Sequence, residues 1–372
     1  MSAPLTILHL THEGHGAGSS ISIALLAREQ ARAGHRVVVG CPPGTWLEKL
    51  VRDRGAAAYA PIDFSTSTVA AFEIERLTVL LKVDVVNAHS SRDRAACRKL
   101  RFARRLRAAL VMTRRGMPMS SLVSGVLSGL AADRTIAVSH PVARALVHRG
   151  TPPWRISVVH NAVDLSRVDR VPSAEERFEV DALLYSRDAL VATQPVIGVV
   201  SRRKDHDVLL RALEFVKTPV TLCCVGFQPD GYLTRLPSPA AHRVVWVPFH
   251  DDVRAFYDRF DIVVLPSRHE GMSQGLLEAM AIGKPVVATD GGGNRDLIDT
   301  GVHGLLVPPR DAAALGAALQ RMLDDRALRA DVAAAGRRRV RGEFTIERTL
   351  EGTDAVYRTA LGRRGSRGRG TR

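Results

Sequence analysis

The chain has 372 residues, of which 45% are hydrophobic and 24% are charged, and this size and balance suit a globular protein of two domains. No apolar run is long enough to span a bilayer, and MSAPLTILHL lacks the features of a secretory leader, so we expect neither a membrane span nor export. The net charge of +15 is concentrated: residues 92–115 hold ten Lys or Arg against one Asp, and residues 358–372 hold six Arg and no acid. Such a concentration predicts an anionic partner, either a phospholipid surface or nucleic acid.

The cysteines show neither a CxxC pair nor the spacing of a zinc site. Two of them are neighbours inside an apolar run, which favours buried free thiols. The sequence therefore predicts a protein of the reducing cytosol. The four cysteines are Cys41, Cys97, Cys223 and Cys224.

The first half of the chain alternates short β-branched runs with helical stretches such as 20–33 and 140–149. Continuous apolar strands separated by helices predict a parallel sheet that is buried on both faces. The expected strands are 5–10, 36–40, 84–87, 109–113, 134–138 and 156–159.

A glycine-rich loop, THEGHGAGSS at residues 11–20, follows the first expected strand and leads into a helix capped by Ser19 or Ser20. Its glycines do not fit the dinucleotide fingerprint, and no acid ends the second strand, so NAD binding is not expected. His89 follows the strand 84–87, at the edge of the sheet where α/β proteins bind ligands.

Residues 92–107 predict a strongly basic helix, and residues 117–130 form a small-residue and apolar segment after it. A basic and amphipathic pair favours a surface helix on anionic lipid. The alternative is a solvated helix followed by an ordinary core-facing helix. Nucleic-acid binding is less favoured, because only 5% of the residues are aromatic and stacking platforms are missing.

Charge-rich residues 166–193 interrupt the alternation, which then resumes with strands at 195–200, 219–225, 243–248, 261–265 and 285–289. We therefore expect two α/β domains of the Rossmann type joined by a linker. The expected parts are an N-terminal Rossmann-like domain at 1–165, the linker at 166–193, a C-terminal Rossmann-like domain at 194–345, a helix at 346–361, and a basic disordered tail at 362–372.

The stretch RHEGMSQGLLEAMA, residues 268–281, places Glu270 before a glycine and Glu278 in an expected helix. Ser273 can cap this helix, which runs to about Ile282 and ends at Gly283. The free N–H groups at its start favour phosphate, and two carboxylates beside them suit a ligand with hydroxyl groups around a phosphate. The alternative is that Glu270 caps the helix and Glu278 lies on its surface.

The same stretch resembles the E-x7-E element of retaining GT-B glycosyltransferases of family GT4, and the likeness continues through AMAIGKPVVATDGGGNRDLI to GLLVPPRD. VIGVVSRRKDHDVLLRAL (196–213) resembles the Arg–Lys element of the family, and ISVVHNAVD (156–164) resembles its Asn-Gly-Val-Asp turn, with Ala162 in the glycine position. The resemblance implies an α/β fold of the GT-B class, in which two Rossmann-like domains with parallel sheets face each other across a cleft.

The resemblance also implies roles for individual residues. Glu270 should orient the donor sugar, Glu278 should bind ribose hydroxyls, and the loop with Gly16 and Gly18 should close over donor and acceptor. Arg202 and Lys204 should hold the donor diphosphate. Because the loop is shorter than usual in the family, Arg203 could take the role of Arg202. The implied catalytic residues are His89, Arg202, Lys204 and Glu270. The implied donor-binding residues are Gly16, Gly18, Arg203, Gly271, Met272, Ser273, Gln274, Gly275 and Glu278.

Asp205 and Asp207, in the DHD motif, open an expected helix and suit its N-terminus, so no metal and no other cofactor is expected. The implied reaction moves a sugar from a nucleotide-sugar donor to an acceptor hydroxyl with retention. The expected acceptor is a lipid-linked or envelope saccharide of a bacterium, reached from the cytoplasm, with residues 92–130 and the basic tail on an anionic membrane. The alternatives are another GT-B enzyme such as a UDP-sugar epimerase, or a non-enzymatic basic nucleic-acid-binding protein.

Overall fold

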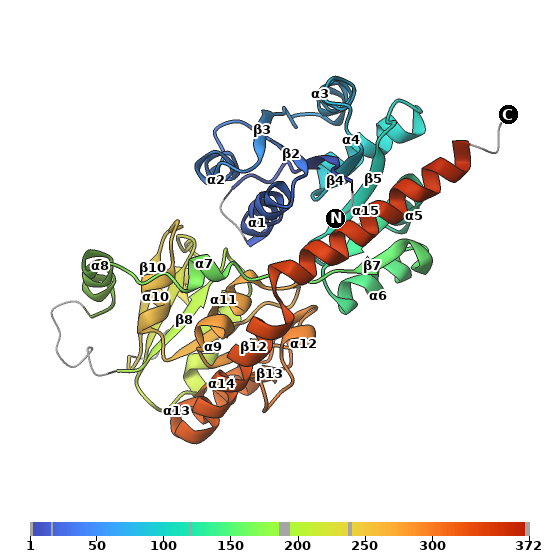
Figure 1. Cartoon of the computed structure of the whole chain (residues 1–372). Coiled ribbons are helices and arrows are strands. Elements are labelled where there is room, and N and C mark those ends of the chain that lie inside the picture. Colours follow the sequence, from blue (N-terminus) through green and yellow to red (C-terminus); the bar gives the residue numbers. More distant parts are fainter. Residues whose placement is uncertain (1–2, 16–17, 119–120, 186–193, 237–239, 369–372) are drawn as a thin grey trace. The chain divides into compact units, whose positions relative to one another are not determined.

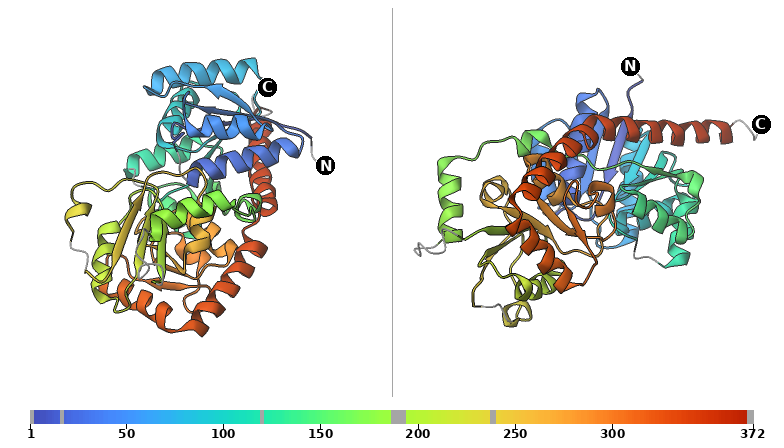
Figure 2. Two further views of the ribbon diagram at one scale, coloured as in Figure 1. Left: turned by 90° about the vertical axis from the view of Figure 1, so that its left-hand side faces the viewer. Right: turned by 90° about the horizontal axis from the view of Figure 1, so that it is seen from below.

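The computed structural model describes residues 3–15, 18–118, 121–185, 194–236 and 240–368. The chain divides into two compact units, each with its own sheet and core. Unit 1 holds residues 1–162 and the segment from Ile346 onward, and unit 2 is Val163–Thr345. Figures 1 and 2 show the two units, each with helices on both faces of its sheet.

Unit 1 alternates strands and helices along the chain. Its elements are β1 (Thr6–Leu10), α1 (Gly18–Arg32), β2 (Arg36–Cys41), α2 (Trp46–Arg54), β3 (Ala58–Pro61), α3 (Ser67–Leu80), β4 (Val85–Ala88), α4 (Ser91–Phe102), β5 (Ala109–Arg114), α5 (Leu122–Ala131), β6 (Arg134–Ala137), α6 (His140–His148), β7 (Ile156–Val158) and α15 (Ile346–Gly368).

The seven strands of unit 1 form one parallel sheet in the order β3-β2-β1-β4-β5-β6-β7. Leu8 of β1 lies beside Val38 on one side and Val86 on the other, and all three are buried. The strand order reverses between β1 and β4, so the loops that follow these two strands meet at the carboxyl edge of the sheet.

Helix α15 completes unit 1 from the far end of the chain. It packs against α1, β5 and β6. The Tyr357 hydroxyl is fully buried and accepts a hydrogen bond from Asn87 Nδ2 at 2.7 Å, while Thr113 Oγ1 donates to Asn87 Oδ1 at 2.8 Å. Because Asn87 lies in β4, this bond links the last helix to the centre of the sheet.

Unit 2 has the same alternation. Its elements are α7 (Leu165–Val168), α8 (Ala174–Tyr185), β8 (Val196–Val200), α9 (His206–Ala212), β9 (Thr221–Val225), β10 (Arg243–Val247), α10 (Arg254–Arg259), β11 (Ile262–Leu265), α11 (Gln274–Ile282), β12 (Val286–Thr289), α12 (Asn294–Leu297), β13 (Leu305–Val307), α13 (Ala312–Asp324) and α14 (Arg326–Glu343).

The six strands of unit 2 form a parallel sheet in the order β10-β9-β8-β11-β12-β13. This is the Rossmann order, and it reverses between β8 and β11. Gly198, in β8, lies against Phe260, and a Cβ there would be 2.1 Å from the ring. The glycine therefore allows the helix-to-strand turn at Phe260 to pack directly on the centre of the sheet.

The predicted strands and the α/β class are confirmed, each strand within about two residues. Two strands were missed: β3 and β13, the outermost strands on one side of each sheet. The prediction of a disordered tail from residue 362 is wrong as far as Gly368, because α15 continues to that residue. The expected linker holds α7 and α8, and its residues 186–193 lie outside the described part. None of the described helices is both long and apolar enough to cross a bilayer.

We expect Tyr357→Phe to lower the free energy of unfolding by about 1–3 kcal/mol, because it leaves the buried amide of Asn87 without its acceptor. Urea unfolding of the full chain measures this. The matched control is Thr359→Ala on the same helix, whose exposed hydroxyl should contribute less than about 0.5 kcal/mol. Equal effects of the two substitutions would contradict a linking role for Tyr357.

Candidate functional site

The loops that follow β8 and β11 meet where the strand order of unit 2 reverses. Lys204 Nζ lies 3.0 Å from Glu270 Oε1, and the Glu270 side chain is mostly buried. Asp205 Oδ2 accepts a hydrogen bond of 2.9 Å from the Arg268 backbone N–H, and Arg268 Nε lies 3.3 Å from the other carboxylate oxygen. Two segments that are more than sixty residues apart in the chain therefore form one charged cluster in unit 2.

Helix α11 begins beside this cluster, as predicted. The Ser273 side chain accepts a hydrogen bond from the Leu276 N–H, and the helix ends at Gly283 with φ +94°. A Cβ on Gly275 would lie 2.8 Å from the Val200 carbonyl oxygen, so glycine lets the helix start close to the end of β8. Gly271, Met272 and Gln274 are buried at this helix mouth.

Glu278 is buried inside the first turns of α11, with 4% of its surface exposed. Burial raises the pKa of its carboxyl, Arg167 opposes that rise, and Asp252 and Asp164 add to it. Arg167 Nε is 3.6 Å from Glu278 Oε1, and among the described residues no group donates a hydrogen bond to that oxygen. A buried carboxylate oxygen without a donor is costly, and a ligand hydroxyl would satisfy it.

The alternative interpretation of this pair of acids is wrong. Glu278 is not on the surface of α11, and Glu270 does not cap the helix, because Ser273 does. The Glu270 carboxylate instead pairs with Lys204. Glu278 is therefore buried inside unit 2, and Glu270 is partly buried in an ion pair, so neither is a solvated surface acid.

A glycine run after β12 fixes the backbone of Glu270, and sequence reasoning missed it. The Gly293 N–H donates to the Glu270 carbonyl oxygen at 3.0 Å. A Cβ on Gly292, whose φ is +61°, would lie 2.0 Å from that oxygen, and one on Gly291 would lie 2.5 Å from the Ser267 carbonyl oxygen. Three consecutive glycines after a strand are the sequence feature that could have predicted this close approach of two backbone segments.

The two arginines of the basic segment after β8 differ in their ion pairs. Arg203 forms an ion pair with Asp230, whereas Arg202 is exposed and has no ion pair among the residues that the structure describes. His206 Nδ1 accepts a hydrogen bond of 3.0 Å from the Lys204 N–H, and burial lowers the pKa of His206 to about 4. A neutral His206 therefore holds the backbone from which the Lys204 side chain projects.

The expected capping role of the DHD motif needs correction. Asp205 stands at the N-cap position of α9, but its side chain makes no capping bond. Its carboxylate bonds to the backbone and side chain of Arg268 instead. Asp205 thus ties the loop after β8 to the loop after β11.

In unit 1, His89 lies after β4 within a buried chain of hydrogen bonds. Arg115 Nε donates to His89 Nδ1 at 3.3 Å, so the His89 proton sits on Nε2, which faces His9 Nδ1 at 2.9 Å. His9 Nε2 then faces Gln30 Oε1 at 2.7 Å. Burial is the main cause of low pKa values in both rings: the pKa of His89 lies well below its usual value, and that of His9 is lowered to about 4. Both rings are therefore neutral.

Three arginines crowd the same edge of unit 1. Burial lowers the pKa of Arg94, that of Arg114 to about 9 and that of Arg115 to about 10. Arg94 donates to the His89 carbonyl oxygen at 2.5 Å, and Arg115 Nη1 donates to Asn161 Oδ1 at 2.8 Å. Desolvated positive charge at the end of a parallel sheet suits an anionic group on a ligand. The sequence shows how many arginines this region holds, but it does not distinguish these buried ones from the exposed ones.

The loop after β1 packs against the start of α4. The His12 backbone N–H and Nδ1 each lie 3.3 Å from Asp93 Oδ1. Helix α1 begins at Gly18, so Ser19 and Ser20 lie within it and the expectation that one of them precedes it as a cap is wrong. Gly16 lies outside the described residues.

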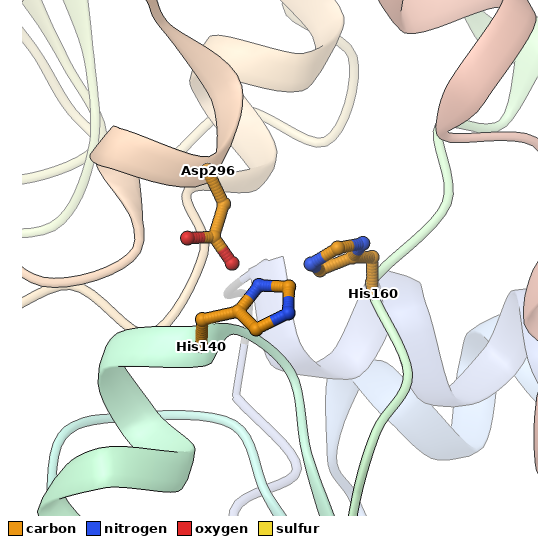
Figure 3. Close-up of side chains that lie close together, drawn as sticks. All are labelled: His140, His160 and Asp296. Carbon is orange, nitrogen blue, oxygen red and sulfur yellow. The ribbon is translucent and has the colours of Figure 1, made fainter.

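A second histidine pair of unit 1 was missed by sequence reasoning. His140 begins α6 and His160 follows β7, and their rings are tilted by 60° with centroids 5.5 Å apart (Figure 3). Asp296, which is also drawn, belongs to unit 2. Two histidines are fewer than the ligands of a protein zinc site, so this pair alone does not make a metal centre in unit 1.

Two family models match the chain, one in each half. The model described as Glycosyltransferase Family 4 matches residues 16–167, and the model described as Glycosyl transferases group 1 matches residues 194–325. The first lies in the part of the chain that forms most of unit 1, and the second covers the loops after β8 and β11.

Among curated proteins, a D-inositol 3-phosphate glycosyltransferase of Salinispora arenicola is 33% identical over 251 residues, which is 62% of this chain and 55% of that protein. A lipopolysaccharide core biosynthesis mannosyltransferase of Rhizobium leguminosarum is 37% identical over 217 residues, or 55% of this chain and 60% of that protein. The chain therefore spans little more than half the length of these relatives.

Solved structures show the same fold over almost the whole chain. An Anabaena protein, HepE, in complex with UDP-glucose has a TM-score of 0.80 at 20% identity, covering 95% of this chain and 99% of that one. Sucrose-phosphate synthase from Thermosynechococcus elongatus has a TM-score of 0.79 at 19% identity, covering 96% and 99%. At these identities the likeness establishes the fold, two Rossmann-like units of the GT-B class.

Glu278→Gln should change the pH dependence of stability. Because the folded pKa of Glu278 is raised, its contribution to stability is complete below the unfolded pKa and is lost as the pH rises through the folded pKa. We expect wild type and variant to be equally stable in acid and the variant to be the more stable at neutral pH. Urea unfolding from about pH 4 to about pH 8 measures this.

The control for this measurement is Glu214→Gln, which changes an exposed carboxylate of the same unit. Its stability should differ from wild type by a constant amount across the pH range. A constant offset for Glu278→Gln as well would contradict the burial of an ionised carboxylate in α11.

Proposed function

We propose, from the premise that the chain is a two-domain member of the GT4-like glycosyltransferases, that it transfers a sugar from a nucleotide-sugar donor to an acceptor hydroxyl and retains the anomeric configuration. The observation that carries the proposal is the cluster in unit 2 of Lys204, Glu270 and the mouth of α11, with the buried Glu278 one turn inside. Together they offer positive charge, backbone donors and two carboxylates to one ligand.

Each part of this cluster suits one part of a nucleotide sugar. The N–H groups at the start of α11 and the cations Arg202 and Lys204 suit the diphosphate. Glu278 Oε1 is a buried acceptor for a ribose hydroxyl, and Glu270, fixed by Gly292, is an acceptor for hydroxyls of the sugar. The Anabaena structure with UDP-glucose supports a donor of this class.

The reaction that we propose proceeds on one face of the sugar. The bond from the anomeric carbon to the diphosphate oxygen breaks while a bond to the acceptor oxygen forms on the same side. The acceptor proton passes to the departing diphosphate. Arg202, Lys204 and the α11 donors stabilise the negative charge on that diphosphate, in place of a divalent cation or any other cofactor.

For the acceptor, we propose a saccharide or polyol with an anionic group, such as a lipid-linked or envelope saccharide. Arg94, Arg114 and Arg115 support the anionic group, because their guanidinium groups gather at the carboxyl edge of unit 1 beside His89. The names of the relatives include an inositol phosphate glycosyltransferase and a lipopolysaccharide core mannosyltransferase. His89, neutral and held by Arg115, would contact the sugar or the acceptor.

We further propose that the protein works in the cytoplasm on the inner face of an anionic membrane. Helix α5 supports this, because its large apolar side chains are exposed and lie along one side of the helix at spacings of three and four residues. The predicted alternative, an ordinary core-facing helix, does not fit these exposures. The exposed residues are Leu122, Val123, Val126, Leu127 and Leu130.

Substitutions of the two carboxylates should affect donor binding and sugar transfer differently. Glu278→Ala should weaken binding of the accepted nucleotide sugar about ten- to hundredfold, because it removes one hydrogen bond to a charged group. Glu270→Gln should slow transfer about hundredfold through a misplaced sugar, with a smaller change in donor affinity. A thermal-shift screen of UDP-, GDP-, ADP- and TDP-sugars finds the donor first.

Calorimetry and product analysis then measure the two effects, with Glu214→Gln as the control that should leave both unchanged. Unaltered binding and transfer in both variants would refute the assignment of the cluster. Conversion of the sugar nucleotide by wild type without an acceptor would instead identify an epimerase.

Arg202→Ala and Arg203→Ala form a matched pair for the diphosphate. Because Arg203 is paired with Asp230, we expect Arg202→Ala to weaken binding of the nucleoside diphosphate by about tenfold and Arg203→Ala to have a smaller effect. The parent nucleoside, which lacks phosphate, should bind both variants as it binds wild type. A larger loss in Arg203→Ala would assign the diphosphate to Arg203.

A further inference from the structure

Unit 1 has a second cationic site at the opposite edge of its sheet from His89. A cavity of about 400 Å³ lies at the amino ends of β5, β6 and β7. Its walls come from the end of α4, the segments that precede these strands, the end of α5, and α15. It is thus separated by the length of the strands from the edge with His89, where we propose that the acceptor binds.

The charge of this cavity is strongly positive. Five arginines line it and Asp133 is its single acid, which is paired with Arg101 at 2.7 Å. Arg104 and Arg107 are exposed, and within the described part of the chain their side chains make no ion pair and no hydrogen bond. The five are Arg101, Arg104, Arg107, Arg155 and Arg363.

Two of these arginines are fixed as parts of the wall. Arg101 donates to the Leu106 and Ala108 carbonyl oxygens. Arg155 donates to carbonyl oxygens at the end of α5, those of Gly129 and Leu130, and to that of the next residue but one, Ala132. The guanidinium groups are therefore ordered before any anion arrives, which lowers the entropy cost of binding. Burial lowers the pKa of Arg134, and the charge of Arg363 lowers it further, so like charges also act on one another near this cavity.

Helix α5 brings an apolar surface to the rim of this cavity. Its small residues face inward: a Cβ on Gly125 would lie 2.1 Å from the Arg149 carbonyl oxygen, and Arg98 bonds to the hydroxyls of Ser124 and Ser128. Its large residues therefore face outward, and Leu130, 57% exposed, is also part of the cavity wall. Trp154 is 67% exposed next to Arg155.

We propose that this cavity binds the phosphate of an anionic phospholipid head group while the exposed face of α5 contacts the acyl layer. The proposal rests on the membrane association proposed above and adds a defined head-group site to it. The combination of arginines with an adjoining apolar helix face and an exposed tryptophan fits a phosphate carried on an acyl chain. A free phosphate compound would use the arginines alone.

The test measures binding of the full chain to vesicles of phosphatidylcholine with and without phosphatidylglycerol, by co-sedimentation. Arg104→Gln with Arg107→Gln should weaken binding to the anionic vesicles about thirtyfold, from about 1 kcal/mol for each arginine. The matched control is Arg321→Gln with Arg326→Gln, which removes the same charge from exposed positions of unit 2 and should change binding little. Leu127→Ser, on the outward face of α5, should weaken binding without changing the charge.

Three results would overturn the proposal: equal loss in the two double variants, no loss in either, or a thermal shift with inorganic pyrophosphate that depends on Arg104 and Arg107 while vesicles do not bind. Donor binding to the same variants, measured by thermal shift, distinguishes failure of the head-group site from failure of the proposed reaction. Failure of vesicle binding with intact donor binding refutes only the head-group site. Absence of any nucleotide-sugar binding in wild type refutes the proposed reaction and leaves the vesicle result standing.

Discussion

The side-by-side pairing of β8 and β11 is the constraint on which the candidate site of unit 2 depends. These strands are separated by more than sixty residues of chain, and only the reversal of strand order at this point brings their following loops together. The Lys204–Glu270 pair, the Asp205–Arg268 bonds and the close approach of Gly275 to Val200 all cross this junction. Unit 1 repeats the arrangement at β1 and β4, where His9 and His89 meet.

Burial gives the charged residues at these junctions their chemical character. Inside α11, desolvation opposes the ionisation of Glu278, and the attraction of Arg167 offsets only part of it. In unit 1, the same effect keeps His9 and His89 neutral and lowers the pKa of three arginines. Among these groups, Glu278 Oε1 has no hydrogen-bond donor within the described part of the chain, and a polar ligand would supply that partner.

Much of the fold was predictable from the sequence, because buried parallel strands are continuous apolar runs that no surface helix imitates. The two missed strands, β3 and β13, are short and lie at sheet edges, where one side is unpaired and the apolar signal is weak. The helical end of α15 was missed because its Arg- and Gly-rich letters resemble a disordered segment. Local composition contains no information about which distant surface a helix packs on.

Only part of the candidate site was predictable from the sequence. Ser273, Gly283 and the start of α11 follow from local capping rules, so they were found in the sequence. The role of Gly292 beneath Glu270 and the burial of Glu278 depend on contacts with other segments, and no local pattern contains them. The same limit applies to α5. The sequence indicates a small-residue and apolar segment at 117–130, but contacts with Arg98 and the Arg149 backbone determine which face of the helix points inward.

The two groups of arginines in unit 1 follow from one feature, the polarity of its parallel sheet. Arg94, Arg114 and Arg115 lie at the carboxyl edge and are desolvated, so salt screens their interactions weakly. Arg104 and Arg107 lie at the amino edge in contact with solvent, where screening is strong. A sheet whose strands all run one way keeps these two sites a full strand apart, so an anion at one edge leaves the charge at the other unneutralised. The arginines of unit 1 named here therefore form two separate groups at opposite edges of its sheet.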